Sequence, residues 1–297
     1  MKILIIGYQG YVGSGLYNFL NREHDVTGWS RRDDVLKLNR EFLLGKSIDV
    51  VINCATVMDR VGSTFATDSL TYRVNIDGMR NLVSQLKNTN IKLLYISTKD
   101  VYGEVFNESN VNEVDKYFEL PHFVDDNQSF NPQTAYGKSK LIGEFIAEGH
   151  PNHVIIRLSS CYTDFDHFRG HWVPNLIKAL SFGSKITLTN KGKQVRALLH
   201  VNDLGRLIAL IIKSHKKRIK LNVGGGKKNI LSILQFIELM DSKPKVSYIQ
   251  GNDYGFVFNN ELARKEFNWQ PEIIFQERLP ILIKNLARSI TALKGDN

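Results

Sequence analysis

The sequence predicts an α/β protein in which a parallel sheet is covered by helices on both faces. In the N-terminal half, short apolar segments alternate with longer segments whose apolar residues recur at helical spacing. A glycine-rich turn directly follows the first apolar segment. Parallel strands need a crossover connection, usually a helix, so this alternation favours a doubly wound parallel sheet.

The predicted strands of this sheet are short and bounded by polar or turn residues, as buried strands are. They are Lys2–Ile6, Asp25–Trp29, Asp49–Cys54, Lys92–Ser97 and His153–Leu158. The predicted helices between them carry apolar residues at helical spacing. They cover Val12–Asn21, about Ser69–Lys87 and about Thr134–Glu148.

The alternation becomes less regular after Arg157. The helices predicted there are Trp172–Leu180, Asp203–Lys213, Ile230–Met240 and Glu277–Leu293, and the strands are Ile186–Leu188, Ala197–Val201 and Lys220–Val223. We therefore predict a first domain over residues 1–160, with residues 198–223 returning to its sheet. Residues 161–197 and 224–297 are predicted to form a smaller C-terminal domain.

Composition limits the class of protein. Of 297 residues, 42% are apolar and 23% are charged, which is ordinary for a soluble globular chain. The apolar run within Met1–Ile6 is too short for the core of a signal peptide or for a membrane span. Cys54 and Cys161 lie inside apolar runs, so we expect no disulfide framework and a reducing, cytoplasmic setting.

The net charge of +9 has two interpretations. The basic segments His215–Arg218 and Lys227–Lys228 could bind nucleic acid, or they could provide a positive field for an anionic small molecule. No aromatic residues interleave with those lysines, and neither helix-turn-helix nor zinc-ligand spacing occurs. We expect a phosphate-bearing small molecule as the partner, and neither nucleic acid nor a membrane.

The glycine-rich turn has the spacing GxxGxxG and places Gly7, Gly10 and Gly13 between a predicted strand and a predicted helix. Glycine there permits a tight turn and lets a diphosphate approach backbone N–H groups at the helix N-terminus. A plain turn is the alternative, but this context is the one that a Rossmann dinucleotide-binding fold requires. We therefore predict that these glycines, with Tyr11 and Val12, contact a dinucleotide cofactor.

The residues after the second predicted strand indicate which dinucleotide binds. Proteins that use NAD commonly place an acidic residue there for the ribose hydroxyls. This chain has Ser30, Arg31 and Arg32 instead. A hydroxyl and two guanidinium groups suit a 2′-phosphate, so we predict NADP. NAD is the alternative if the two arginines are ordinary loop charges.

Tyr136 and Lys140 are candidates for proton transfer. They are four residues apart and share one face of the predicted helix, while the apolar residues within Leu141–Ile146 are predicted to form its packed face. A tyrosine has an ordinary pKa of about 10, and a cation held close favours the phenolate. An ordinary Tyr–Lys surface pair is the alternative.

The glycine-rich turn and three other segments make a resemblance to a known family specific. They are Gly7–Gly13, Asn75–Gly78, Ser97–Gly103 and Arg196–Asp203. With the Tyr-xxx-Lys pair, these segments resemble, in the right order, motifs of the extended short-chain dehydrogenase/reductase family of nucleotide-sugar epimerases, dehydratases and reductases. The matches span about residues 3 to 271. The resemblance implies a Rossmann domain followed by a smaller C-terminal substrate-binding domain.

The resemblance also implies roles for individual residues. Tyr136 would exchange a proton with the sugar oxygen, Lys140 would hold the nicotinamide ribose and lower the tyrosine pKa, and Thr98 would hydrogen-bond the reacting oxygen. Further cofactor contacts are expected from Cys54, Ala55, Asn75 and Ser97. The substrate, a nucleotide-diphosphate sugar, is expected to contact Lys99, Asp100, Ser160 and Arg196, with the arginine on its diphosphate.

Two further expectations concern assembly and metal binding. Members of this family commonly form homodimers through helices near Ser69–Lys87 and Thr134–Glu148, and we expect the same here. His167 and His171 lie in a charged loop. A pair of loop histidines more often contacts substrate or solvent than a metal, so we expect no metal site.

The segment after Thr98 narrows the reaction. Sugar 4,6-dehydratases carry an Asp-Glu pair there, whereas this chain has Lys99 and Asp100. Lysine does not readily replace a protonated carboxylic acid, so a dehydratase is disfavoured. Together with the Ser30–Arg32 signal for NADPH, this favours a 4-ketosugar reductase similar to dehydrorhamnose reductase. A C4-epimerase with tightly bound NAD is the alternative, and a catalytically silent NADP-binding regulator is the non-enzyme alternative.

Overall fold

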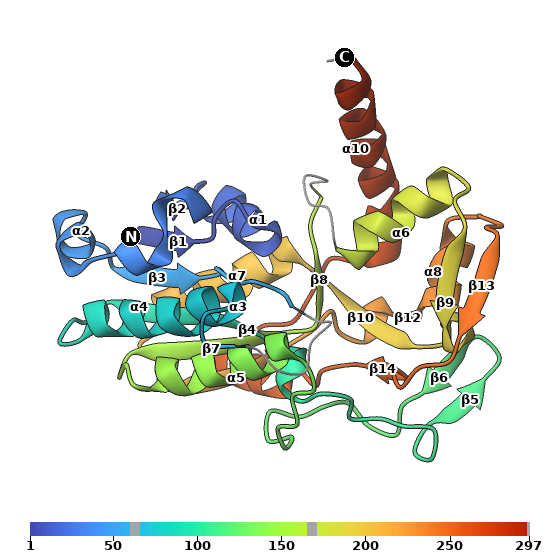
Figure 1. The fold of residues 1–297 in the computed structure, drawn as a ribbon, viewed down its shortest axis with the longest axis horizontal. Helices are drawn as coiled ribbons and strands as arrows, with labels where there is room; N and C mark the ends of the chain where they lie inside the picture. Colours follow the sequence, from blue (N-terminus) through green and yellow to red (C-terminus); the bar gives the residue numbers. More distant parts are fainter. Residues whose placement is uncertain (60–65, 165–170, 296–297) are drawn as a thin grey trace.

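A parallel sheet forms the centre of the computed structural model, which describes residues 1–59, 66–164 and 171–295 (Figure 1). Its strand order is β11-β7-β4-β3-β1-β2, and every pairing is parallel. The strands are β1 (Lys2–Ile6), β2 (Asp25–Trp29), β3 (Val50–Asn53), β4 (Lys92–Thr98), β7 (His153–Leu158) and β11 (Ile219–Val223). The predicted doubly wound Rossmann fold is confirmed.

Helices cover both faces of this sheet because successive strand residues point to opposite sides. Ile3 and Ile5 of β1 pack with α1 (Tyr11–Leu20), α7 (Val201–Lys213) and α9 (Glu261–Phe267). The alternating residues Leu4 and Ile6 pack with the opposite layer. That layer consists of α2 (Arg40–Gly45), α4 (Gly78–Leu86) and α5 (Ala135–Glu148).

The helix predicted over Ser69–Lys87 contains a wider turn. It begins as α3 (Leu70–Tyr72), passes through a π-helical turn at Arg73–Asp77 and continues as α4. Such turns insert one extra residue into a helix and are common at functional sites. Here the turn contains Asn75, whose side chain is buried.

The remaining strands form a second, smaller sheet and two separate strand pairs. One sheet has the order β12-β10-β14, with β8 also paired to β10. Its strands are β8 (Ser160–Tyr162), β10 (Val195–His200), β12 (Ile230–Ser232) and β14 (Gly255–Phe256). Two strand pairs lie beside it: β9 (Ile186–Thr189) with β13 (Val246–Ile249), and β5 (Asn112–Val114) with β6 (Tyr117–Glu119).

The helices of this part share one apolar core. They are α6 (Trp172–Ser181), α8 (Ile233–Leu239) and α10 (Phe275–Gly295), and α10 projects from the body of the molecule (Figure 1). Within the predicted returning segment 198–223, β11 joins the central sheet, whereas residues 198–200 belong to β10. The domain boundaries remain a prediction.

The helix predicted over Ile230–Met240 was wrong at its start. Residues 230–232 pair with β10 as an antiparallel strand, and α8 begins only after Ser232. Ser232 accepts a hydrogen bond from the backbone N–H of Gln235, and the Gln235 side chain accepts one from the Ser232 N–H. This capping box fixes the start of the helix.

Short 3-10 turns complete the secondary structure. The turns are Arg31–Asp33, Val35–Lys37, Lys99–Val101, Asn190–Gly192 and Lys227–Asn229. Within the part of the chain that the structure describes, every helix is too short or too polar to cross a bilayer.

A buried lysine connects the central sheet to the end of α7. Lys92, 7% exposed, donates from Nζ to the carbonyls of Ile211 (2.9 Å), Ser214 (2.6 Å) and Lys216 (3.3 Å). Carbonyls at a helix C-terminus lack helical partners and carry partial negative charge, so a buried ammonium stabilises them.

Replacing this lysine tests the connection. Lys92→Met keeps the aliphatic volume but removes the ammonium from the carbonyls of Ser214 and Lys216, so we expect the free energy of unfolding to fall by about 2 kcal/mol. The Ile211 carbonyl keeps its hydrogen bonds from Ser214. Urea denaturation measures the change, with the exposed Lys217→Met as the matched control. An equal stability of the two variants would contradict the interpretation.

Candidate active site

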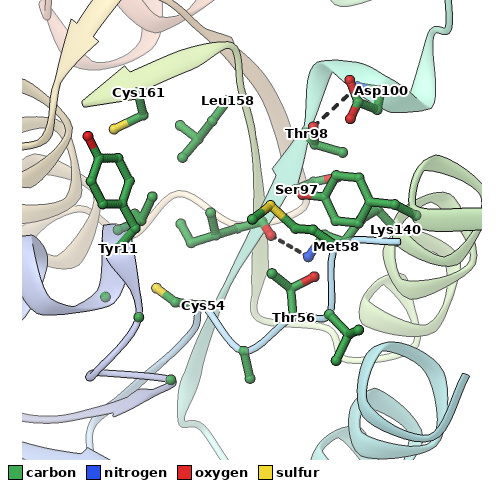
Figure 2. Close-up of a pocket in the computed structure, with 18 of the residues that line it drawn as sticks. Tyr11, Cys54, Thr56, Met58, Ser97, Thr98, Asp100, Lys140, Leu158 and Cys161 are labelled. Atoms are coloured by element: carbon green, nitrogen blue, oxygen red, sulfur yellow. Dashed lines mark hydrogen bonds between the residues drawn. The ribbon is translucent and has the colours of Figure 1, made fainter. Parts of the chain in front are cut away.

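A cleft of about 960 Å³ lies at the carboxyl ends of β1, β3, β4 and β7. Here the strand order reverses, since the chain passes from β1 to β2 on one side and then to β3 on the other. Doubly wound folds bind ligands at such a point. Tyr11, Cys54 and Cys161 lie on one side of the cleft, and Ser97, Thr98 and Lys140 lie on the other (Figure 2).

The glycine turn leaves no room for side chains. Gly7 has a φ of +80°, and a Cβ there would lie 2.8 Å from the backbone N of Ala55. A Cβ on Gly13 would lie 2.2 Å from the Gly7 carbonyl oxygen. Gly10, at the start of α1, provides no side-chain cap, and the first turn has no acidic residue. The uncapped helix N-terminus therefore suits the diphosphate of a dinucleotide.

The predicted 2′-phosphate segment forms a tight turn beside the cleft. Ser30 accepts a hydrogen bond from the N–H of Arg32 (3.2 Å) and donates its hydroxyl to Asp33 (2.7 Å). Hydrogen bonds from Ser30 lower the pKa of Asp33. Ser30 and Arg31 line the cleft, whereas Arg32 is not among the lining residues.

Asn75 supports the cleft from behind. Its amide accepts from the N–H of Val57 (2.8 Å) and donates to the Val57 carbonyl (2.9 Å) and to Ser139 Oγ (2.8 Å). Cys54 and Ala55, which precede Val57, line the cleft, but Asn75 does not. The π-helical turn thus positions a side chain that holds the loop after β3 rather than the cleft surface itself.

Helix α5 carries Tyr136 and Lys140 into the cleft, and both are buried, at 6% and 2% exposure. Thr134 caps the helix by accepting from the N–H of Gly137 (3.0 Å). Lys140 Nζ donates to the carbonyl of Ile96 (2.6 Å; Figure 2) and lies 4.0 Å from the centre of the Tyr95 ring.

The packed face of α5 was predicted wrongly. Ile142 and Phe145 are 36% and 58% exposed, and the face that carries Tyr136 and Lys140 packs against β4 instead. Its small residues allow close approach: a Cβ on Gly143 would lie 2.1 Å from the hydroxyl oxygen of Tyr95. Small and paired polar residues can pack as densely as apolar ones, so apolar periodicity indicated the wrong side.

A buried ion pair fixes this face to the sheet. Arg157 of β7 donates to Glu144 from Nε (3.0 Å) and Nη2 (2.7 Å), and both residues are 1% exposed. Glu144 also accepts a hydrogen bond from Ser97 Oγ (2.5 Å). Sequence reasoning missed Glu144, although it follows Lys140 at the four-residue spacing that keeps Tyr136, Lys140 and Glu144 on one helix face.

Burial sets the protonation of the groups at the centre of the cleft. Desolvation lowers the pKa of Lys140 to about 7 and raises the pKa of the Cys54 thiol to about 12. Lys140 therefore loses its charge near neutral pH in the free protein, and Cys54 stays protonated.

The residues predicted to bind substrate also line the cleft. Thr98 accepts a hydrogen bond from the N–H of Asp100 (3.2 Å; Figure 2), and Lys99 Nζ lies 3.2 Å from Asp100 Oδ1. Arg196 forms an ion pair with Asp253. Ser160 also lines the cleft, as do Glu104 and Asp253, which sequence reasoning missed. Neither belongs to a motif, and Asp253 lies 57 positions from its partner.

His171 contributes to the wall of the cleft. Its ring stacks on Tyr11, with 3.8 Å between ring centres and 16° between the planes. His167, the other histidine considered for metal binding, lies outside the described residues. Within the described ranges, no group of three or more His, Cys, Asp or Glu side chains is arranged to hold a metal ion.

Comparison with known sequences identifies the family. The sequence model of the NAD dependent epimerase/dehydratase family matches residues 3–224. The chain therefore belongs to this family. Its relative dTDP-glucose 4,6-dehydratase 1 from Escherichia coli (strain K12) is 25% identical over 225 residues, in an alignment that covers 68% of this chain and 61% of the dehydratase. The chain thus spans about three fifths of that relative's length.

Solved structures share the fold over nearly the whole chain. UDP-glucuronic acid 4-epimerase from Bacillus cereus, in complex with NAD, has a TM-score of 0.80 at 21% identity, covering 97% of this chain and 99% of the epimerase. dTDP-4-dehydrorhamnose reductase from Bacillus anthracis, in complex with NADP, has a TM-score of 0.74 at 20% identity, covering 97% of both chains. At these identities the likeness shows the fold.

The glycine turn generates the first prediction for this site. In Gly13→Ala the new methyl group collides with the Gly7 carbonyl, so α1 must shift, and we expect affinity for the nicotinamide dinucleotide to fall by about tenfold or more. Fluorescence titration measures the affinity. Gly45→Ala is the matched control, because a Cβ there meets nothing within 4 Å. Unchanged affinity in a folded Gly13→Ala protein would refute the assignment of this turn.

Lys140 generates the second prediction for this site. The negative charge of a bound dinucleotide should raise the pKa of Lys140 above its free value of about 7, so binding takes up a proton at higher pH. Cofactor affinity should therefore fall as pH rises from about 7 to 9, by up to about tenfold per pH unit. Calorimetry in buffers of different ionisation enthalpy measures the uptake.

Lys140→Met is the control for that measurement, since it removes the titrating group and with it the proton uptake. Affinity that is independent of pH over this range in the unmodified protein would contradict a role for the lysine beside the cofactor.

Proposed function

We propose that this protein is an NAD(P)-dependent enzyme that acts on a nucleotide-diphosphate sugar, and specifically a 4-ketosugar reductase that uses NADPH. The observation that carries the proposal is that Tyr136, Lys140 and Thr98 line the same cleft as the glycine turn. Membership of the epimerase/dehydratase family supports the class of substrate and cofactor.

The bound nicotinamide would supply the hydride that reduces the sugar ketone. Tyr136 would donate the proton that converts the resulting alkoxide into a hydroxyl. The ammonium of Lys140 would stabilise the phenolate that remains, and the Thr98 hydroxyl would hydrogen-bond the reacting oxygen. Lys140 is held for this task by the Ile96 carbonyl and the Tyr95 ring.

The residues after Thr98 favour reduction over dehydration. Elimination of water needs a group that protonates the leaving hydroxyl, and Lys99 occupies the position where dehydratases carry a carboxylic acid. Its ammonium is paired with Asp100 at 3.2 Å. An ordinary lysine ammonium is a far weaker acid than a carboxyl, so it would be a poor proton donor to that hydroxyl at neutral pH.

Arg31 favours NADPH over NADH. Its side chain lines the cleft beside Ser30, at the end of β2 where an acidic residue would otherwise contact the ribose. A guanidinium there would pair with a 2′-phosphate. Choice of NADPH in turn favours a reductase, which consumes an exchangeable cofactor, over a C4-epimerase with bound NAD.

Assembly as a homodimer is part of the proposal. Leu70 at the start of α3 is 48% exposed, and Ile142 and Phe145 on α5 are 36% and 58% exposed. Large apolar side chains exposed on adjacent helices would be buried by a second copy packed against the same face. α3 and α5 contact one another.

Turnover of defined substrates tests the proposed function. We expect one of a panel of UDP-, dTDP-, CDP- and GDP-linked 4-keto sugars to be reduced, with NADPH preferred over NADH. Tyr136→Phe should lower kcat by about a hundredfold or more and leave NADPH affinity unchanged. NADPH absorbance follows the reaction.

The rival functions give different results in the same assay. A purified protein that carries NAD and interconverts epimers without added cofactor is a C4-epimerase. A protein that binds NADPH and turns over no member of the panel is a regulator. That outcome would be supported if the Tyr136→Phe variant had the same biological effect in the cell as the unmodified protein.

A further inference from the structure

The segment after β2 presents two opposite charges to the cleft. Within residues 29–35, the charged side chains that line the cleft are Arg31 and Asp34. Arg32 and Asp33 are not among the lining residues. The wall at this point therefore carries one guanidinium and one carboxylate, which balance each other.

This balance affects the choice between NADPH and NADH. The end of β2 is where a dinucleotide-binding fold contacts the adenosine ribose, and a carboxylate there favours the 2′-hydroxyl of NADH. NADPH has a phosphate in place of that hydroxyl, with up to two further negative charges. Arg31 thus favours NADPH at this wall, and Asp34 opposes it.

The carboxylate of Asp34 is fixed in its place. Oδ1 accepts a hydrogen bond from the N–H of Leu36 (3.1 Å) and caps the short turn Val35–Lys37. The backbone carbonyl of Asp34 accepts another from Trp29 Nε1 (3.3 Å). Its φ of +53° is uncommon for a residue with a side chain, although Asp adopts such angles more often than most. Asp34 therefore stays at the wall, where its charge needs a partner.

Arg73 is the partner of this carboxylate. Its Nη2 lies 2.9 Å from Asp34 Oδ2, the oxygen that does not accept from Leu36. The hydrogen bond from Leu36 lowers the pKa of Asp34, and Arg73 and Lys37 lower it further. Asp34 is therefore ionised at neutral pH, and the guanidinium of Arg73 offsets its charge.

The π-helical turn Arg73–Asp77 brings Arg73 to this position. The same turn carries Asn75, which holds Val57 in the loop after β3. Val57 and Asp34 both line the cleft. The turn therefore supports the wall of the cofactor site at two points, in keeping with the frequent occurrence of such turns at functional sites.

We propose that Arg73 is a specificity-determining residue, which offsets the charge of Asp34 so that the wall beside Arg31 accepts the 2′-phosphate of NADPH. Two guanidinium groups then face one carboxylate, and the wall has a net positive charge. Arg73 is not itself among the lining residues. The proposal rests on the proposed function in that it assumes a nicotinamide dinucleotide in the cleft, and it is independent of the sugar.

The ratio of NADPH affinity to NADH affinity tests the role of Arg73. Arg73→Met keeps an apolar stem and removes the charge, so we expect NADPH affinity to fall about fivefold or more relative to NADH affinity. Fluorescence titration at low salt measures both affinities, because salt screens exposed charges. A structural defect would weaken both dinucleotides equally, and an unchanged ratio would overturn the proposal.

Removing the carboxylate tests the charge balance. Asp34→Asn keeps the side-chain shape and the acceptor for Leu36, so we expect it to raise the affinity ratio in favour of NADPH. In the double variant Asp34→Asn/Arg73→Met the wall again has one charge in excess, so the ratio should return to within about twofold of that of the unmodified protein. A double variant that stays as low as Arg73→Met would mean that Arg73 binds the phosphate directly, and would refute the charge balance.

A matched control lies one helical segment further along the chain. Arg80 of α4 is exposed, pairs with Asp77 (3.0 Å) and is not among the lining residues. Arg80→Met removes the same charge from a similar ion pair, so we expect it to leave the affinity ratio unchanged. Thermal denaturation verifies that each variant is folded.

Failure of the proposed function would give a different pattern. If the unmodified protein bound NADH more tightly than NADPH, the proposed cofactor of the reductase would be wrong. Arg73→Met should still lower the affinity ratio in that case, and the role of Arg73 would stand. The absence of sugar reduction would leave the ratio unaffected, whereas a protein that binds neither dinucleotide would refute both proposals.

Discussion

The buried ion pair between Glu144 and Arg157 is the interaction on which the rest of the site depends. It joins α5 to β7, and through Ser97 it also joins α5 to the end of β4. Replacing such a pair with apolar residues can be neutral for stability, but losing one partner leaves an uncompensated buried charge. The pair is therefore better understood as a device that fixes position. It fixes the helix that carries Tyr136 and Lys140 against β4, the strand that ends at Thr98.

The two ends of the cleft are built on different principles. The cofactor end depends on the absence of side chains, since a Cβ at Gly7 or Gly13 would collide with backbone atoms. The substrate end depends on side-chain charge, with ion pairs formed by Lys99 and Arg196. A conserved kind of ligand needs a fixed backbone shape, whereas side-chain charge is easily varied between relatives with different substrates.

Much of the fold and part of the site could be predicted from sequence. Buried parallel strands are continuous apolar runs, and β1, β2 and β7 have the predicted bounds. The glycine turn and the Tyr136–Lys140 pair depend on local spacing, which sequence displays directly. The start of α8 was wrong because the pairing of Ile230–Ser232 with β10 is a long-range contact. Glu104 and Asp253 were missed for the same reason, since tertiary structure alone brings them together.

The contact between Gly143 and Tyr95 has a consequence for how this site can evolve. The helix lies so close to β4 that a methyl group at position 143 would overlap the Tyr95 hydroxyl. Any larger residue there would have to displace either the Tyr95 ring or α5, the helix that carries Tyr136 and Lys140. The spacing between helix and sheet thus sets where the proposed catalytic residues lie. Gly143 does not line the cleft and has no functional group of its own, yet selection for activity would restrict which residue can occupy this position.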